Sequence, residues 1–425
     1  MNMFTKCTSL SIVTVSTLLF LTGCGGSSSS EPTKDSLYIK SAVYDTNETA
    51  DITDDTLSIY FNRTVDINTS DENLSQSFDI NGTGTFGEFV KLDYNDSMFH
   101  RLKITLDANS TQFVPGVTNI ALSNLNKLQN IFSLNHAEVT VTSPRRLLKT
   151  GQSASYIAHD DGEYQTGETR SYTSNGDGTV TDDVTGLIWQ ESDDGVLRDW
   201  NSAKNYCEAL TTASLTWQLP SMDQLIELSD KGTNSPAIDV AFNNTKNSEY
   251  WSADEYLASS ADDIWTVNFA NSRTNDPDKS LSHYVRCVNI AKVQGEARYT
   301  RDNTNQVVLD ASTNLIWQDT PDTISDADKK TWSEAVDSCE QLDLGGYSDW
   351  RLPNLNELNS ITDKMTHGPA MDKEFQNKKS NRFWSSTTED ANSSSAWYSY
   401  FYCGCNDVED KTDANNVRCV RTAEK

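Results

Sequence analysis

The chain contains 425 residues, which is too many for one ordinary hydrophobic core, so we expect several domains. Its 62 acidic residues outnumber its 34 basic residues, and a formal charge of −28 excludes the basic footprint that nucleic-acid binding requires. Five histidines leave little capacity for general-base chemistry, so we expect a protein that is not an enzyme.

The N-terminus has the pattern of a secretory signal peptide. Lys6 precedes an apolar run, Leu10 to Leu21, that is too short to span a bilayer comfortably. The run ends in Leu-Thr-Gly before Cys24, which resembles a lipobox, and Gly25 in place of aspartate favours the outer membrane. An ordinary signal peptide with a chance cysteine is the alternative. We therefore expect a membrane-anchored lipoprotein with a signal peptide at 1–23 and a flexible tether at 24–36.

Residues 37–145 contain no cysteine or tryptophan, and apolar residues alternate with polar ones in short runs. The clearest runs are 57–61, 102–106 and 139–141. This period of two predicts β-strands. The run Phe61–Asp66 resembles the Phe-x-x-x-Val-Asp strand of bacterial immunoglobulin-like domains. That resemblance implies an all-β immunoglobulin-like sandwich that spaces the rest of the chain from the membrane, followed by a linker at 146–168.

All ten tryptophans lie beyond residue 188, and they form two sets of five. The offsets between corresponding members are 128, 132, 133, 133 and 132 residues, which indicates an internal duplication. Neighbouring motifs agree, because Leu-Ile-Trp-Gln, Trp-x-Leu-Pro and Val-Arg-Cys-Val each occur once per set. The two sets are Trp189, Trp200, Trp217, Trp251 and Trp265, then Trp317, Trp332, Trp350, Trp384 and Trp397.

Four cysteines follow the same duplication. Cys207 and Cys287 are 80 positions apart, and so are Cys339 and Cys419. In the oxidising compartment of an exported protein, this repeated spacing predicts two equivalent disulfide bonds, with buried free thiols as the alternative. Closing a loop of that length would stabilise each copy by roughly 4 kcal/mol.

Each copy is expected to contain two short helices and several strands. Thr331, with glutamate three positions later, has the capping-box pattern of a helix start. A second helix follows the Leu-Pro motif in each copy, with Ser221 and Asn354 as N-caps. Alternating runs at 264–269 and 397–401 predict half-buried strands, so each copy is α+β. In this setting we expect the tryptophans to be packing residues.

Specific motifs mark the two copies. They are Asn175–Val180, Thr185–Trp189, Leu344–Pro353, Phe383–Ser386 and the two Val-Arg-Cys-Val ends. Over residues 169–292 and 298–424, these motifs resemble the Legionella collagen-like protein C-terminal domain family. The resemblance implies a C-type lectin-like fold, shared with formylglycine-generating enzymes, and adhesion to sulfated glycans. The acidic charge of the chain opposes a polyanionic ligand unless a local basic patch offsets it.

The resemblance implies a surface lipoprotein that presents two lectin-like modules to an extracellular glycan or protein ligand. On the fold analogy, ligand contacts lie in the loops between the tryptophan strand and the last cysteine, where exposed polar and aromatic groups are expected. The candidate residues are Asn271, Arg273, Asp276, Tyr284, Tyr398, Tyr400, Asn406 and Asp407. A structural envelope or pilus-associated scaffold is the alternative function.

Further hypotheses concern metal and redox chemistry. We expect no cofactor, with bound calcium as the alternative, because two acidic clusters occur although neither matches a full calcium loop. They are Asp177, Asp182 and Asp183, then Asp407, Glu409 and Asp410. Cys403 and Cys405 have no counterpart in the first copy, and a bridge between them, an intermolecular link, or a thiol pair with redox or metal chemistry all remain open. An oxidase of the formylglycine-generating type is the remote alternative.

Overall fold

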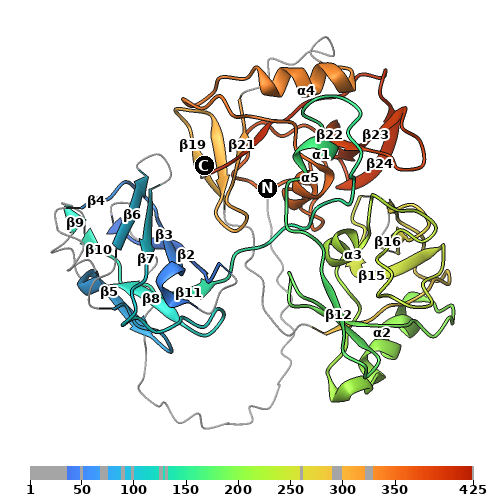
Figure 1. Ribbon diagram of the computed structural model, residues 1–425, viewed down its shortest axis with the longest axis horizontal. Helices are drawn as coiled ribbons and strands as arrows, with labels where there is room; N and C mark the ends of the chain where they lie inside the picture. Colours follow the sequence, from blue (N-terminus) through green and yellow to red (C-terminus); the bar gives the residue numbers. More distant parts are fainter. Residues whose placement is uncertain are drawn as a thin grey trace, which may run out of the picture.

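A computed structural model describes residues 36–47, 51–67, 75–87, 91–96, 100–123, 128–129, 133–258, 262–289, 299–320 and 329–423. The predicted signal peptide, Cys24 and nearly all of the predicted tether lie outside these residues. The described chain is rich in β-strands and has few, short helices. Figure 1 shows an N-terminal β-body and two further bodies, one for each copy of the repeat. Within the described ranges, no helix is both long and apolar enough to cross a membrane.

The N-terminal body consists of short strands around one core. Its elements are β1 (Ser36–Leu37), β2 (Ile39–Asp45), the 3-10 helix η1 (Ile52–Asp54), β3 (Thr56–Phe61), β4 (Asp66–Ile67), β5 (Phe78–Asn81), β6 (Lys91–Asp96), β7 (Arg101–Thr105), β8 (Asn119–Leu122), β9 (Leu128–Gln129), β10 (Ser133–Leu134) and β11 (Val139–Thr142). Seven strands follow the order β5-β8-β11-β2-β3-β7-β6. Leu57, Ile59 and Phe61 of β3 are buried in the core, as their alternation predicts. The three runs predicted as strands correspond to β3, β7 and β11.

The first copy combines two sheets with two helices. Its elements are β12 (Tyr172–Ser174), β13 (Thr179–Asp182), β14 (Ile188–Gln190), α2 (Trp200–Ala209), the 3-10 helix η3 (Thr212–Ser214), α3 (Met222–Leu228), β15 (Glu249–Glu255), β16 (Ile264–Asn268), β17 (Arg273–Asn275) and β18 (Val288–Asn289). One sheet has the order β12-β13-β14-β18 and the other has the order β15-β16-β17. Strand β18 therefore returns the end of the copy to the sheet in which it began.

The second copy repeats this arrangement. Its elements are β19 (Tyr299–Asp302), β20 (Val307–Asp310), β21 (Leu315–Gln318), α4 (Trp332–Glu340), α5 (Leu355–Ser360), β22 (Arg382–Thr388), β23 (Ser395–Tyr400), β24 (Cys405–Asp410) and β25 (Val420–Thr422). The sheet orders are β19-β20-β21-β25 and β22-β23-β24. The duplication seen in the tryptophan spacing is thus a duplication of architecture.

The local signals of the sequence appear at the expected places. Capping boxes at Ser221, Thr331 and Asn354 begin α3, α4 and α5. All ten tryptophans are buried, and the most exposed of them, Trp200, retains only 7% of its surface. They are packing residues, as predicted.

Three disulfide bonds are present among the described cysteines. Cys207 is bonded to Cys287, and Cys339 is bonded to Cys419, with Cα atoms 5.6 and 5.4 Å apart. These are the two pairs that the repeated spacing predicted. The third bond joins Cys403 to Cys405 across a single glycine.

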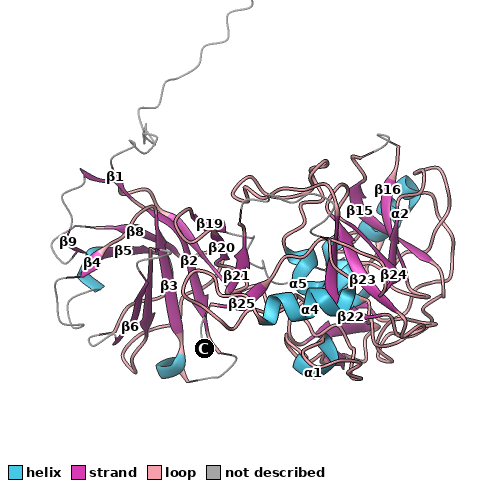
Figure 2. Ribbon diagram, turned by 90° about the horizontal axis from the view of Figure 1, so that it is seen from above, coloured by secondary structure: helices cyan, strands magenta, loops and turns pink. Residues whose placement is uncertain are grey.

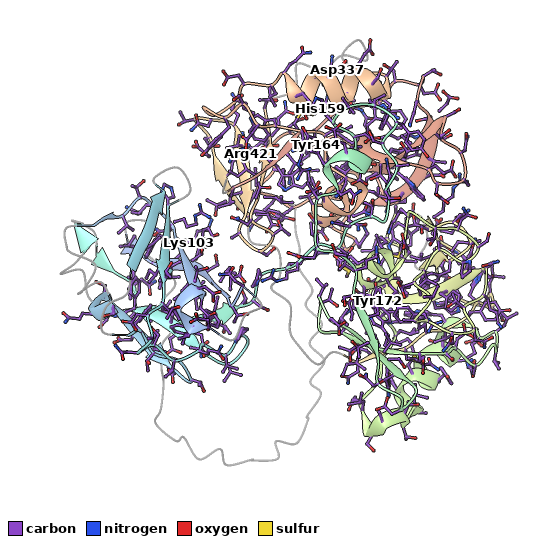
Figure 3. The ribbon with its side chains drawn as sticks, viewed as in Figure 1. Lys103, His159, Tyr164, Tyr172, Asp337 and Arg421 are labelled. Atoms are coloured by element: carbon purple, nitrogen blue, oxygen red, sulfur yellow. A yellow bond between two sulfur atoms is a disulfide. The ribbon has the colours of Figure 1, made fainter. Side chains whose placement is uncertain are left out.

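Residues 146–168 were predicted as a linker, but they form an ordered strap across both copies. The carbonyl of Thr150 accepts a hydrogen bond from the N–H of Lys231 in the first copy (2.7 Å). In the second copy, the N–H of Thr388 donates to Oε1 of Gln152 (2.6 Å). The strap contains helix α1 (Asp161–Tyr164), whose Tyr164 hydroxyl donates to Glu340 Oε1 at 2.8 Å (Figure 3).

The two copies meet through corresponding strands, β17 of the first and β24 of the second. The hydroxyl of Thr274 accepts a hydrogen bond from the N–H of Asn406 (2.9 Å) and donates to its carbonyl (3.3 Å). Next to this pair, Arg273 lies 3.2 Å from Asp407 and 3.1 Å from Glu389. The contact between the copies therefore includes hydrogen bonds and ion pairs, alongside the apolar packing of Cys403 against the first copy.

The N-terminal body packs on the first sheet of the second copy. Figure 2 shows β19, β20 and β21 beside β2. Val43 and Tyr60 share an apolar cluster with Val307 and Leu309 of β20. The amine of Lys40 donates to the Thr300 hydroxyl at 3.1 Å.

Candidate functional site

A polar hollow of about 350 Å³ opens on the second copy. Most of its lining residues lie between Trp384 and Cys419, the region from which ligand contacts were predicted, and the others precede Trp384. We call it the β22–β24 hollow, and it is lined by Lys329, Asn381, Arg382, Tyr400, Glu409, Asp413, Ala414, Asn415 and Asn416. Of the eight predicted ligand residues, only Tyr400 lines it.

Adjacent strands hold the charged groups of this hollow. Arg382 begins β22 and Tyr400 ends β23, and the two residues are partners in the register of the sheet. The Arg382 guanidinium forms an ion pair with Glu409 of β24 (Nη1 to Oε1, 2.5 Å). It also lies 5.0 Å from the ring centroid of Tyr398. Tyr398 itself is buried, and burial raises the pKa of its phenol. Its predicted exposure is therefore wrong, and its ring supports the guanidinium from below the surface.

Two asparagines complete the hollow. The Asn415 amide donates to Oε2 of Glu409 (2.8 Å), and the Asn416 amide donates to the carbonyl of Arg382 (3.0 Å). Asn416 is 2% exposed, and its Oδ1 has no hydrogen-bond partner within the described structure. Backbone bonds to Arg382 and Trp384 hold this residue in place, and its unpaired oxygen is enclosed by protein atoms.

Sequence reasoning missed Arg382, Asn415 and Asn416. A usable signal existed, because Asn-Asn directly precedes Val-Arg-Cys-Val in the second copy, where the first copy has His-Tyr. Polar side chains immediately before a buried strand and a disulfide are held rigidly. Arg382 carried no such signal, since its partner Glu409 is distant in sequence.

The corresponding place in the first copy has different chemistry. Glu249 precedes Tyr250 of β15 as Arg382 precedes Phe383, and His283 takes the position of Asn415. The Glu249 carboxylate lies 3.3 Å from His283 Nδ1 and accepts a hydrogen bond from Asn275 (2.7 Å). Burial lowers the pKa of His283, and the Glu249 charge opposes this shift. The first copy therefore places a carboxylate where the second places a guanidinium.

The rims of the two places differ as well. Leu197 and Leu281 of the first copy are exposed. The backbone bridges Arg198–His283 and Lys330–Asn415 align them with Lys329 and Asp413 of the second copy. The second copy therefore offers polar groups to a ligand at positions where the first copy has exposed leucines.

Three predicted ligand residues lie instead at the contact between the copies. Arg273 and Asp407 pair across it, and Asn406 is buried within it. These positions were predicted to be exposed because they lie in loops near the end of each copy. The prediction is wrong for Asn406, which is buried. The tertiary arrangement uses β17 and β24 as an internal interface.

The remaining three predicted residues lie apart from the β22–β24 hollow. Asn271 Oδ1 accepts a hydrogen bond from the N–H of Arg273 (3.2 Å) and shapes the turn before β17. Asp276 is exposed. Tyr284 is half-buried, and its ring is tilted against that of Tyr250, with the ring centroids 5.6 Å apart.

The acidic clusters considered for calcium have their oxygens directed at other groups. Asp177, Asp182 and Asp410 accept hydrogen bonds from backbone N–H groups within their own turns. Asp183 accepts from the Ser171 hydroxyl (2.7 Å), whereas Asp407 and Glu409 face arginines. Across the described ranges, no three His, Cys, Asp or Glu side chains gather in a way that could hold a metal ion. The six carboxylates act as turn and ion-pair residues in this structure.

Comparison with known proteins identifies the repeated unit. The family model of the Lcl C-terminal domain matches residues 178–289 and again residues 306–421. Together, the two matches span more than half of the chain. No curated protein matches it. The matches begin after β12 in the first copy and after β19 in the second, and they include strands of both sheets of each copy.

Proposed function

The chain belongs to the Lcl C-terminal domain family, and from this premise we propose that it is a non-enzymatic surface lipoprotein that binds an extracellular glycan. In this proposal both modules have the C-type lectin-like fold, and residues 37–145 are an immunoglobulin-like spacer. A lipid on Cys24 anchors the mature chain in the outer membrane. Mass spectrometry of the mature N-terminus tests the anchor, because an unmodified Cys24 would contradict it.

The β22–β24 hollow is the observation that carries the binding proposal. Sugar hydroxyls both donate and accept hydrogen bonds, and the hollow offers donors on Arg382 and Asn415 and carboxylate acceptors on Glu409 and Asp413. Tyr400 adds an aromatic group at the rim. Because Glu409 and Asp413 line the same hollow in a strongly acidic chain, we propose a glycan of low negative charge.

Glycan-array binding of the mature chain, followed by calorimetry with any glycan that binds, tests this function. Arg382→Ala and Asn415→Ala are each expected to weaken binding at least tenfold, about 1.4 kcal/mol, because each removes a hydrogen-bonding group from the hollow. Glu249→Ala changes the corresponding position of the first module and is the matched control, with affinity unchanged.

Two outcomes would contradict the proposal. If folded protein binds no glycan on the array, the envelope-scaffold function is favoured. If Glu249→Ala abolishes binding while Arg382→Ala does not, the site lies in the first module. Tryptophan fluorescence verifies folding of each variant, since all ten tryptophans lie in the modules.

A further inference from the structure

The Cys403–Cys405 disulfide differs from the other two in the length of chain that it closes. Its cysteines are 2 positions apart, whereas the others are 80 positions apart. A disulfide stabilises a fold chiefly by restricting the unfolded chain, and the effect grows with the length of the closed loop. Folding therefore stabilises the Cys403–Cys405 disulfide against reduction less than it stabilises the other two disulfides.

Its exposure differs too. Cys207, Cys287, Cys339, Cys403 and Cys419 are buried, and among the six described cysteines Cys405 alone is partly exposed. A thiolate in solvent can therefore approach the Cys405 sulfur, leaving Cys403 as the departing group. The Cys403 sulfur already accepts a hydrogen bond from the N–H of Cys405 (3.3 Å), which would stabilise a thiolate there.

A buried lysine lies against the glycine between the two cysteines. The amine of Lys364 donates to the carbonyl of Gly404 (2.9 Å), and a Cβ on Gly404 would lie 3.3 Å from that nitrogen. Burial lowers the pKa of Lys364, whereas Asp223 and Asp254 favour its charged form, and in that form the amine favours a thiolate at the neighbouring cysteines and hence reduction. The first module has a corresponding buried lysine, Lys231, but no cysteines at the equivalent turn.

The short bridge also lies at the contact between the modules. Cys403 belongs to an apolar cluster whose other fully buried members, including Val267 and Phe269, come from the first module. Strand β24 begins at Cys405, and the next residue, Asn406, is hydrogen-bonded to Thr274. A change at the sulfurs therefore acts directly on the contact between β17 and β24.

We propose that Cys403–Cys405 is a reversible thiol–disulfide site that controls the contact between the two modules, with a small-molecule or protein thiol as its reductant. A thiolate of the reductant attacks the Cys405 sulfur, the Cys403–Cys405 bond breaks, and Cys403 leaves as a thiolate. A second thiolate then attacks the reductant's sulfur in the mixed disulfide. Two electrons pass to the protein, both cysteines take up protons, and the reductant leaves as its disulfide.

Equilibration of the mature chain with stepped ratios of reduced to oxidised dithiothreitol tests the site, with alkylation and peptide mass spectrometry as the readout. Cys403 and Cys405 are expected to become alkylated at a ratio at least tenfold lower than the one that opens the other two disulfides. Lys364→Gln is expected to raise the required ratio at least threefold, whereas the matched control Lys231→Gln leaves it unchanged.

Hydrogen exchange of the selectively reduced protein tests the coupling, with faster exchange expected at residues 271–276. The redox site is overturned if all three disulfides open together with loss of native tryptophan fluorescence. If Lys364→Gln fails to fold, the order in which the three disulfides of the natural chain open still tests the redox site. Unchanged exchange at 271–276 after selective reduction overturns the control of the contact between the modules.

Discussion

At the residue scale, Asp161 in the strap is an ionisable side chain whose burial disfavours its charged form. Its carboxylate is buried, and Oδ2 accepts hydrogen bonds from the hydroxyls of Thr150 (2.5 Å) and Thr387 (2.8 Å). Desolvation raises its pKa from 3.8 to about 6, outweighing the hydrogen bonds, which lower it. Because the folded pKa exceeds the unfolded one, the contribution of Asp161 favours folding below about pH 4 and is lost as pH rises through about 6.

Asp161→Asn removes this ionisation while keeping the shape of the side chain. The unfolding free energy of the variant minus that of the natural chain should rise by about 2 kcal/mol from pH 4 to pH 8. The reason is that only the natural residue must be buried with a charge at the higher pH. Denaturant unfolding at both pH values measures the change. A difference that does not vary with pH would contradict the assignment.

At the element scale, equivalent helices of the two modules start with different amounts of support. Ser221 caps α3 by accepting a hydrogen bond from the N–H of Gln224 (3.2 Å). Asn354 caps α5 through the N–H of Glu357 (2.9 Å), and its amide also donates to the carbonyl and hydroxyl of Thr166 in the strap (both 3.0 Å). The second helix start is thus both a cap and a contact that holds the strap.

Asn354→Ala should therefore cost more stability than Ser221→Ala. We expect a loss of about 1 kcal/mol for the serine, the ordinary value of an N-cap, and about 2 to 3 kcal/mol for the asparagine, since buried bonds to the strap are lost too. Thermal or denaturant unfolding of the two variants makes the comparison. Equal losses would show that the strap contact adds nothing.

At the scale of the whole molecule, Arg145 and Arg146, where the N-terminal body meets the strap, contact all three bodies. The N–H of Arg145 donates to the carbonyl of Ser312 in the second module (2.7 Å), while its guanidinium lies 2.8 Å from Glu227 of the first. Arg146 reaches Asp45 of the N-terminal body at 2.7 Å. Two adjacent residues thus add to the contacts that join the bodies.

Arg145→Met should destabilise the modules by about 3 kcal/mol, because it leaves the buried Glu227 carboxylate without its cation. Burial already raises the pKa of that carboxyl. The double variant Arg145→Met with Glu227→Gln should recover most of the loss. Unfolding followed by tryptophan fluorescence reports on the modules, and a double variant no more stable than the single one would argue against the pairing.

The sequence by itself determined the features that are local or repeated. Tryptophan spacing established the two copies, the cysteine offset of 80 established the pairing of two disulfides, and capping residues located the helix starts. Such signals are readable because each depends on residues close along the chain or on comparison of one copy with the other.

Only the tertiary structure decided which surface residues of each copy are buried in contacts and which partners they have. It placed Arg273, Asn406 and Asp407 at the contact between the modules, made the expected linker a packed strap, and brought Glu409 to Arg382. These outcomes depend on which strand edges and side chains meet across the fold. Spacing along one chain does not encode that, because burial and pairing follow from how separate elements pack together.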